Sequence, residues 1–115
     1  MKLNMDKATQ YLSALKTMPP VTGKVGYAIY RNITLLDAAT KEYRMMRDEL
    51  INKYGSGGMI TKESPNFTQF LEELAPLVSI ECDVDFFTID ADELYNDALS
   101  SNDYFVLQEI AVRHD

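Results

Sequence analysis

One helical pattern of side chains spans residues 25–50 and limits the folds open to this 115-residue chain. Its members recur every three or four residues, and they are Val25, Ile29, Ile33, Leu36, Thr40, Tyr43, Met46 and Leu50. This spacing places them on one face of a single α-helix, with Lys41 and Arg44 off that face. The pattern predicts a helix of roughly 28 residues, about 42 Å long at 1.5 Å per residue.

A shorter helix is predicted before the long one, from about Asn4 to Thr17. Its apolar face consists of Ala8, Tyr11, Leu12 and Leu15. Pro19 and Pro20 then end it, because proline lacks the N–H that a continuing helix needs. This helix can cover only about half of the long apolar face, so another segment must cover the rest.

A further short helix is predicted beyond Gly55, where the long helix ends. Gly55 suits the left-handed conformation that commonly follows a last helical turn. Ser64 is the expected N-cap, Pro65 the first helical residue, and Pro76 the end of the helix. Its apolar face consists of Phe67, Phe70, Leu71 and Leu74. We expect this face to cover the far end of the long helix.

Residues 78–87 alternate between apolar and polar side chains, which indicates a half-buried β-strand. The apolar members are Val78, Ile80, Cys82, Val84 and Phe86. A strand needs a partner for its backbone groups. The chain offers residues 58–61, with Met59-Ile60-Thr61 at their centre, and the same strand of a second protomer is the alternative.

The last part of the chain predicts two more elements. A short acidic turn or helix is expected from Asp90 to Leu94. A terminal helix follows, with Ser101 or Asn102 as its cap. Its apolar residues are Tyr104, Phe105, Leu107, Ile110 and Ala111. The whole pattern predicts one mainly helical α+β domain over residues 1–115.

Three carboxylates share the polar side of the predicted strand, and they are the only candidates for metal chemistry. Glu81, Asp83 and Asp85 follow one another along the strand, with about 7 Å between each one and the next. Three like charges in a row need either a cation or water to screen them. Solvation is far easier to arrange, so we interpret the row as a wet strand edge that discourages aggregation. We expect no catalytic residues, no metal and no cofactor.

Charge is divided unevenly along the chain. Residues 1–62 carry ten Lys and Arg against five Asp and Glu, whereas residues 63–115 carry one Arg against thirteen Asp and Glu. The halves can attract each other within one chain or between two protomers. The net charge of −7 disfavours nucleic acid as a partner, although the basic half alone could contact a phosphate backbone.

No membrane contact is expected. The longest apolar runs are far shorter than the roughly 20 residues that span a bilayer. The residues from Met1 to Asp6 lack the apolar core of a signal peptide, so the sequence predicts a protein of the cytosol.

Three tyrosines are candidates for contact with a protein partner. Tyr27, Tyr30 and Tyr43 are spread around the long helix. A tyrosine ring can be buried while its hydroxyl stays in water, which suits a contact surface. We expect at least one of the three to face a partner. The incompletely covered long helix, the short internal strand partner and the divided charge also suggest a homodimer.

Several stretches together carry a family resemblance. A Pro-Val-x-x-Lys-Val-x-Tyr stretch consists of Pro20, Val21, Lys24, Val25 and Tyr27. The long helix closes with Arg-Asp-Glu-Leu-Ile-x-Lys-Tyr-Gly, from Arg47 to Gly55. The stretch from Phe70 to Leu74 and the acid-alternating strand then follow. In this order, over nearly its whole length, the chain resembles a family of small tailed-bacteriophage and prophage proteins of unknown function.

The resemblance implies that a phage or prophage encodes the protein, which places it in the cytoplasm of a bacterial host or in the virion. It assigns no activity to any residue. We therefore expect a non-enzymatic protein-binding component of phage structure or assembly, with itself and phage structural proteins as partners. The alternative is a small regulator that binds host or phage proteins. A third hypothesis is a divalent-metal enzyme that uses the acidic strand.

Overall fold

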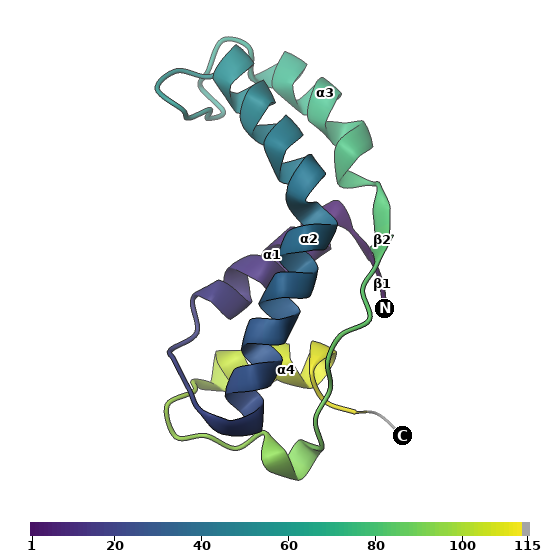
Figure 1. The fold of residues 1–115 in the computed structure, drawn as a ribbon. Helices are drawn as coiled ribbons and strands as arrows, with labels where there is room; N and C mark the ends of the chain where they lie inside the picture. The colour runs from purple at the N-terminus through teal and green to yellow at the C-terminus, as the bar shows by residue number, and fades with distance from the viewer. Residues whose placement is uncertain (114–115) are drawn as a thin grey trace.

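The computed structural model describes residues 1–113, and over these residues the chain folds into helices and one small sheet (Figure 1). The helices are α1 (Met5–Lys16), α2 (Gly23–Tyr54), α3 (Phe67–Val78), the 3₁₀-helix η1 (Ala91–Glu93) and α4 (Ser101–Ile110). The strands are β1 (Lys2–Asn4) and β2 (Glu81–Asp83). The predicted mainly helical α+β class is confirmed. The prediction of a single domain stays a prediction.

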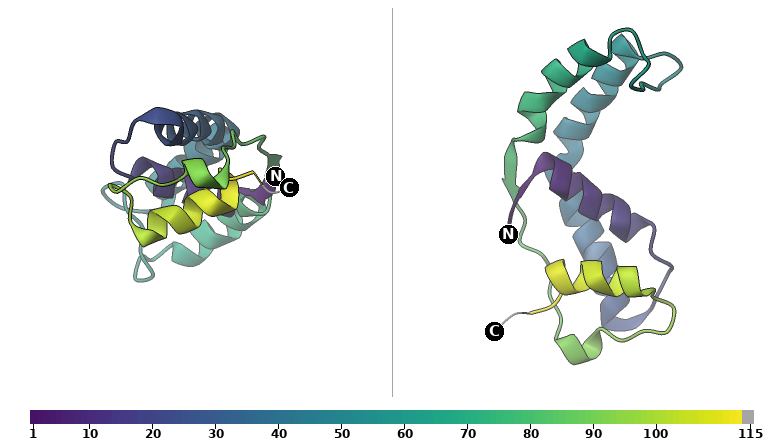
Figure 2. Two further views of the ribbon diagram at one scale, coloured as in Figure 1. Left: turned by 90° about the horizontal axis from the view of Figure 1, so that it is seen from below. Right: turned by 180° about the vertical axis from the view of Figure 1, so that it is seen from behind.

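Helix α2 is the axis of the molecule, as the long apolar stripe predicted. It has 32 residues, which is about 48 Å at 1.5 Å per residue. Helix α1 packs against α2, and α4 lies beside α1 (Figure 2). The core forms where these elements meet, and its most deeply buried residues are Ala8, Leu15, Ala28, Leu36, Leu107 and Ala111.

The end of α2 extends beyond α1 and α4, and α3 runs back alongside it (Figures 1 and 2). We call residues 44–54 together with α3 the arm. The arm makes the molecule long and narrow, with dimensions of 50 × 26 × 19 Å and a radius of gyration of 16.5 Å. A compact chain of about 100 residues has a radius of gyration of about 13 Å. As predicted, α3 covers the far end of α2.

The predicted strand partner is wrong. Strand β2 pairs with β1 in antiparallel register, with Leu3 opposite Cys82. Met59 instead makes a local bridge to Ser56 within the loop after α2, so residues 58–61 are not the partner of β2. The sequence did not reveal β1, because three residues are too few to show a period of two.

The strand is also much shorter than residues 78–87. Val78 belongs to α3, because Pro76 does not end that helix. A proline near the end of a helix removes one hydrogen bond, but its fixed φ of about −65° is helical, so α3 continues for two more residues. Beyond β2, the side chain of Asn32 forms hydrogen bonds with both the carbonyl and the N–H of Phe87. These bonds take the place of those that a neighbouring strand would make.

Several expected caps lie elsewhere. Gly55 has φ −99°, so it is not left-handed; Gly57 and Gly58 take positive φ instead. Position 55 still requires glycine, because a Cβ atom there would lie 2.2 Å from the carbonyl oxygen of Met59. Asn66, not Ser64, precedes α3.

The cap of α4 is also one residue earlier than expected. Ser100 caps this helix, whereas the sequence suggested Ser101 or Asn102. Its hydroxyl accepts a hydrogen bond from the backbone N–H of Asp103. The carboxylate of Asp103 accepts one from the backbone N–H of Ser100 in return. The predicted acidic turn is confirmed as η1.

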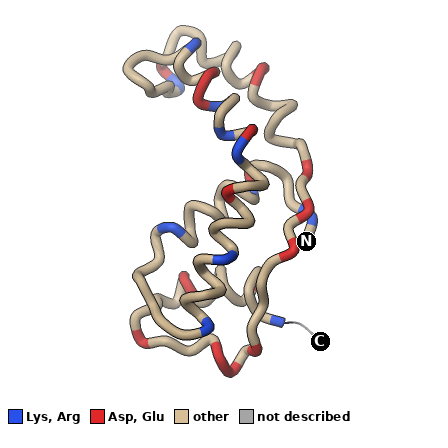
Figure 3. The backbone as a smooth tube through the Cα atoms, viewed as in Figure 1, with Lys and Arg blue, Asp and Glu red and all other residues tan. Residues whose placement is uncertain are grey.

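The basic and acidic parts of the chain meet within one molecule (Figure 3). The ammonium group of Lys24 lies 2.7 Å from the carboxylate of Glu93, and that of Lys53 lies 3.7 Å from Glu73. These two ion pairs support the intramolecular reading of the divided charge.

Arg44 lies off the apolar stripe, so the sequence suggested an exposed residue without partners. The structure shows that its side chain makes several hydrogen bonds. Its guanidinium donates to the Thr40 hydroxyl at 3.0 Å and to the Asp37 carboxylate at 2.6 Å. We expect Arg44→Ala to lower the free energy of unfolding by about 1–2 kcal/mol. Lys41→Ala, on the exposed side of the same helix, should change it by less than about 0.5 kcal/mol. Equal effects in urea denaturation would show that these hydrogen bonds add no stability.

Candidate functional site

The three candidate tyrosines fall into two groups. Tyr27 and Tyr30 are 57% and 62% exposed, so both can reach a partner. The rings of Tyr27 and Phe87 pack in a T-shaped arrangement, with their centroids 4.9 Å apart. Tyr43 is only 8% exposed. Tyr43 therefore offers a partner little surface to contact, and Tyr27 and Tyr30 are the exposed candidates.

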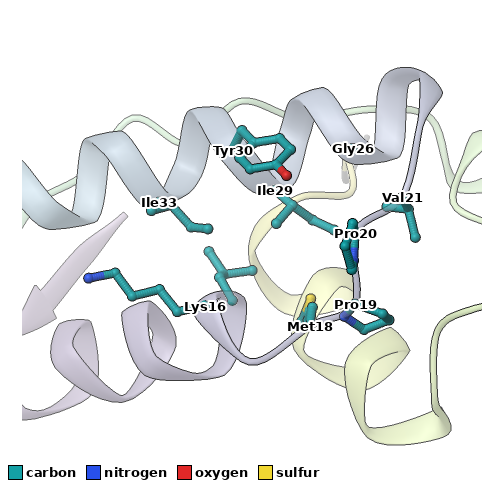
Figure 4. A pocket seen from close by; sticks show the side chains of 10 residues that line it. Lys16, Met18, Pro19, Pro20, Val21, Gly26, Ile29, Tyr30 and Ile33 are labelled. Atoms are coloured by element: carbon teal, nitrogen blue, oxygen red, sulfur yellow. The ribbon is translucent and has the colours of Figure 1, made fainter.

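A small apolar pocket lies beside Tyr30, between the end of α1 and the beginning of α2 (Figure 4). Its volume is about 250 Å³. The residues that line it include Leu15, Met18, Pro19, Pro20, Ile29 and Ile33. Only Lys16 and Tyr30 bring polar side-chain atoms to it. Such a lining can accept an apolar side chain, but it offers no set of converging polar groups for catalysis.

The acidic row lies at the surface, as the sequence predicted. Glu81, Asp83 and Asp85 are all exposed, and Val84 between them is buried. Ile80, expected in the core, is 48% exposed, because it lies in the turn between α3 and β2 rather than in a strand. Among residues 1–113, no three His, Cys, Asp or Glu side chains are grouped so that they could hold a metal ion.

A metal titration tests the acidic row directly. We expect Mg²⁺, Mn²⁺ or Ca²⁺ at low millimolar concentration to leave the melting temperature unchanged, because we interpret the row as solvated. A metal ion that bound only the folded state would raise the melting temperature. Differential scanning fluorimetry with and without a chelator measures this. A rise of several degrees that Asp83→Asn removes would instead support a metal site.

The arm carries apolar surface that the rest of the molecule does not cover. Helix α3 is the most apolar helix of the fold, with Phe67, Phe70, Leu71, Leu74, Ala75, Leu77 and Val78 among its twelve residues. Only Phe70 is buried. Two helices packed side by side have one shared face, so a helix that is apolar over more than one face keeps part of it in water.

One side of the arm forms an open groove of about 550 Å³ between α2 and α3. Its apolar lining consists of Met46, Leu50, Pro76 and Leu77. Its charged lining consists of Glu49, Lys53, Glu72 and Glu73. The sequence pattern missed this groove, because it assigned Met46 and Leu50 to the buried stripe. The breadth of the apolar face of α3 was the signal that could have indicated it.

A buried tyrosine links α1 to α4. The Tyr11 hydroxyl donates a hydrogen bond to the Glu109 carboxylate. Burial raises the pKa of Tyr11 to about 12, with smaller contributions from that hydrogen bond and from the negative charge of Glu109. The ammonium group of Lys7 lies 4.9 Å from the centroid of the Tyr11 ring. Because the hydrogen bond joins two packed helices, we assign the Tyr11–Glu109 pair a structural role.

The raised pKa of Tyr11 predicts a pH dependence of stability. Its folded-state pKa of about 12 lies above the usual value of about 10. The stabilisation is therefore complete below pH 10 and is lost as the pH rises through 12. We expect the stability difference between the wild type and Tyr11→Phe to shrink between pH 10 and 12. A constant difference in urea denaturation across this range would contradict the raised pKa of Tyr11.

Comparison with known proteins places the chain in no family. No family model matches it, and no curated protein or solved structure is significantly similar to it. Within residues 1–113, no helix has the length and apolar character needed to cross a membrane.

Proposed function

We propose that the chain is a non-enzymatic phage or prophage protein that acts by binding other proteins, as a structural or assembly component. The observation that carries the proposal is the arm, where six of the seven apolar residues named above for α3 are not fully buried. The phage origin comes from the sequence resemblance. The binding role comes from the uncovered apolar surface.

The uncovered surface of the arm and of the loop at its tip includes three large apolar side chains. Met46 on α2 is 48% exposed, Leu71 on α3 is 46% exposed, and Met59 in the loop is 67% exposed. Large exposed apolar patches on a water-soluble protein mark sites of interaction. Covering such surface is favourable by about 25 cal/mol per Å². Methionine also adapts its shape to different partners, which suits an assembly component.

The proposed partners are phage structural proteins and a second copy of the chain. Two of the patterns that suggested a homodimer are satisfied within one chain, because β1 pairs with β2 and Lys24 and Lys53 pair with acidic residues. The third pattern was the incompletely covered long helix. Helix α3 covers its far end but leaves Met46 about half exposed, and this exposed apolar surface still favours association. Tyr27 and Tyr30 offer a second exposed surface.

Deletion of the gene from the phage or prophage that encodes it tests the proposed function. We expect fewer complete particles, with an assembly intermediate that electron microscopy reveals and that added wild-type gene removes. The regulatory alternative predicts particles of normal form together with altered timing of phage transcription. Normal particles in normal number at normal times would contradict both.

A further inference from the structure

We propose that the groove of the arm binds a basic amphipathic α-helix of a partner protein. The proposal rests on the proposed function and adds the chemistry of the partner. It follows from three features of the groove: its apolar lining, which we call the floor, its length, and its charged lining, which we call the rim.

The floor suits one face of a helix. Met46 and Leu50 come from α2, and Pro76 and Leu77 come from α3, so both helices contribute apolar side chains to the floor. From Met46 to Lys53 the groove follows α2 for about 10 Å at 1.5 Å per residue. Two turns of a partner helix cover this distance. Apolar residues spaced at i, i+3 or i+4, and i+7 would then lie along the floor, as in other helix-in-groove complexes.

The rim selects for positive charge. Three carboxylates, of Glu49, Glu72 and Glu73, line the groove against a single ammonium group, that of Lys53. Lys53 already lies 3.7 Å from Glu73. Among the residues that the structure describes, no cationic side chain lies within 4.0 Å of the carboxylate of Glu49 or Glu72. Lys or Arg on both flanks of a docked helix would supply the missing partners and set its orientation.

The same rim argues against a second copy in this groove. Two arms placed groove to groove would bring Glu49 and Glu72 of each copy close to those of the other. Like charges facing each other across an interface disfavour association. A homodimer would therefore use another surface of the protein and leave the groove free for the partner helix.

A selection from a helical peptide library tests the proposal. The peptides have about four turns, which is ~14 residues at 3.6 per turn, with Leu fixed at i, i+3, i+4 and i+7. Lys, Glu or Ser vary on both flanks. We expect the wild-type protein to enrich peptides with Lys on the flanks. The Glu49→Lys/Glu72→Lys variant should instead enrich peptides with Glu.

Two adjacent methionines give a matched pair of variants for the selected peptide. Met46 lines the groove and Met45 does not, although both are about half exposed. Fluorescence anisotropy should show affinity about tenfold or more weaker for Met46→Glu and unchanged for Met45→Glu. Raising the salt from about 0.05 to 0.5 M should weaken wild-type binding, because charges are screened over shorter distances.

Three results would overturn the proposal. One is a library that yields no enriched peptide, and another is enrichment that does not depend on flank charge. The third is a dimer of the wild-type protein in sedimentation experiments that Met46→Glu dissociates and Met45→Glu leaves intact. In that case the groove would hold a second copy of the chain. The selection uses purified protein, so its failure is distinct from a failure of the particle experiment.

Discussion

Replacing Leu36 with alanine should lower the free energy of unfolding by about 2–5 kcal/mol. Leu36 lies in the middle of α2, with 0% of its surface exposed, within the core that α1, α2 and α4 share. Truncation removes buried methyl groups and leaves a cavity that close-packed neighbours fill only in part. Urea denaturation of both proteins measures the effect.

Leu71→Ala is the matched control for Leu36→Ala. It makes the same chemical change on the arm, where Leu71 is 46% exposed, and it should lower stability by less than about 1 kcal/mol. A larger effect at Leu71 than at Leu36 would show that the arm, not the α1–α2 region, contains the main core.

Replacing Asn32 with leucine should destabilise the protein by about 2–5 kcal/mol, despite the similar size of the two side chains. The amide of Asn32 donates to the carbonyl of Phe87 at 3.0 Å and accepts from its N–H at 2.8 Å. Asn32 has 0% of its surface exposed. Leucine would leave both backbone groups of Phe87 without partners, at about 1–3 kcal/mol each.

The control for Asn32→Leu is Asn52→Leu, an exposed position on the same helix. It should change stability by less than about 0.5 kcal/mol. Hydrogen exchange supplies a second readout, because the amide of Phe87 should exchange faster in Asn32→Leu than in the wild type. Unchanged exchange at Phe87 would mean that Asn32 does not hold this segment.

The helices of the fold were predictable because their signals are local. The stripe from Val25 to Leu50 lies within one segment, so its period identifies α2 without knowledge of the rest of the chain. Proline signals were less reliable. Pro76 was expected to end α3, yet a proline in a last turn forfeits only one hydrogen bond.

The sheet and the groove depend on contacts between distant parts of the chain. Strand β1 has three residues and pairs with β2 some eighty positions away, so no short window contains the pair. The role of Asn32 was hidden for the same reason, because its partner Phe87 is 55 residues away. A helical stripe shows which side chains share a face, but not how much of that face other helices cover. Met46 therefore belongs to the stripe and is still half exposed.

The central inference is that the arm serves binding rather than folding, and a complementation assay tests it. Met46→Glu/Leu71→Glu places charge on exposed apolar sites of the arm, whereas Tyr95→Glu changes a residue that is 77% exposed outside it. Each variant is returned to the gene-deleted phage or prophage, and its melting temperature is measured in parallel. We expect both to melt near the wild-type temperature, but particle yield to fall about tenfold or more only for the arm variant. Wild-type yield from the folded arm variant would contradict the inference.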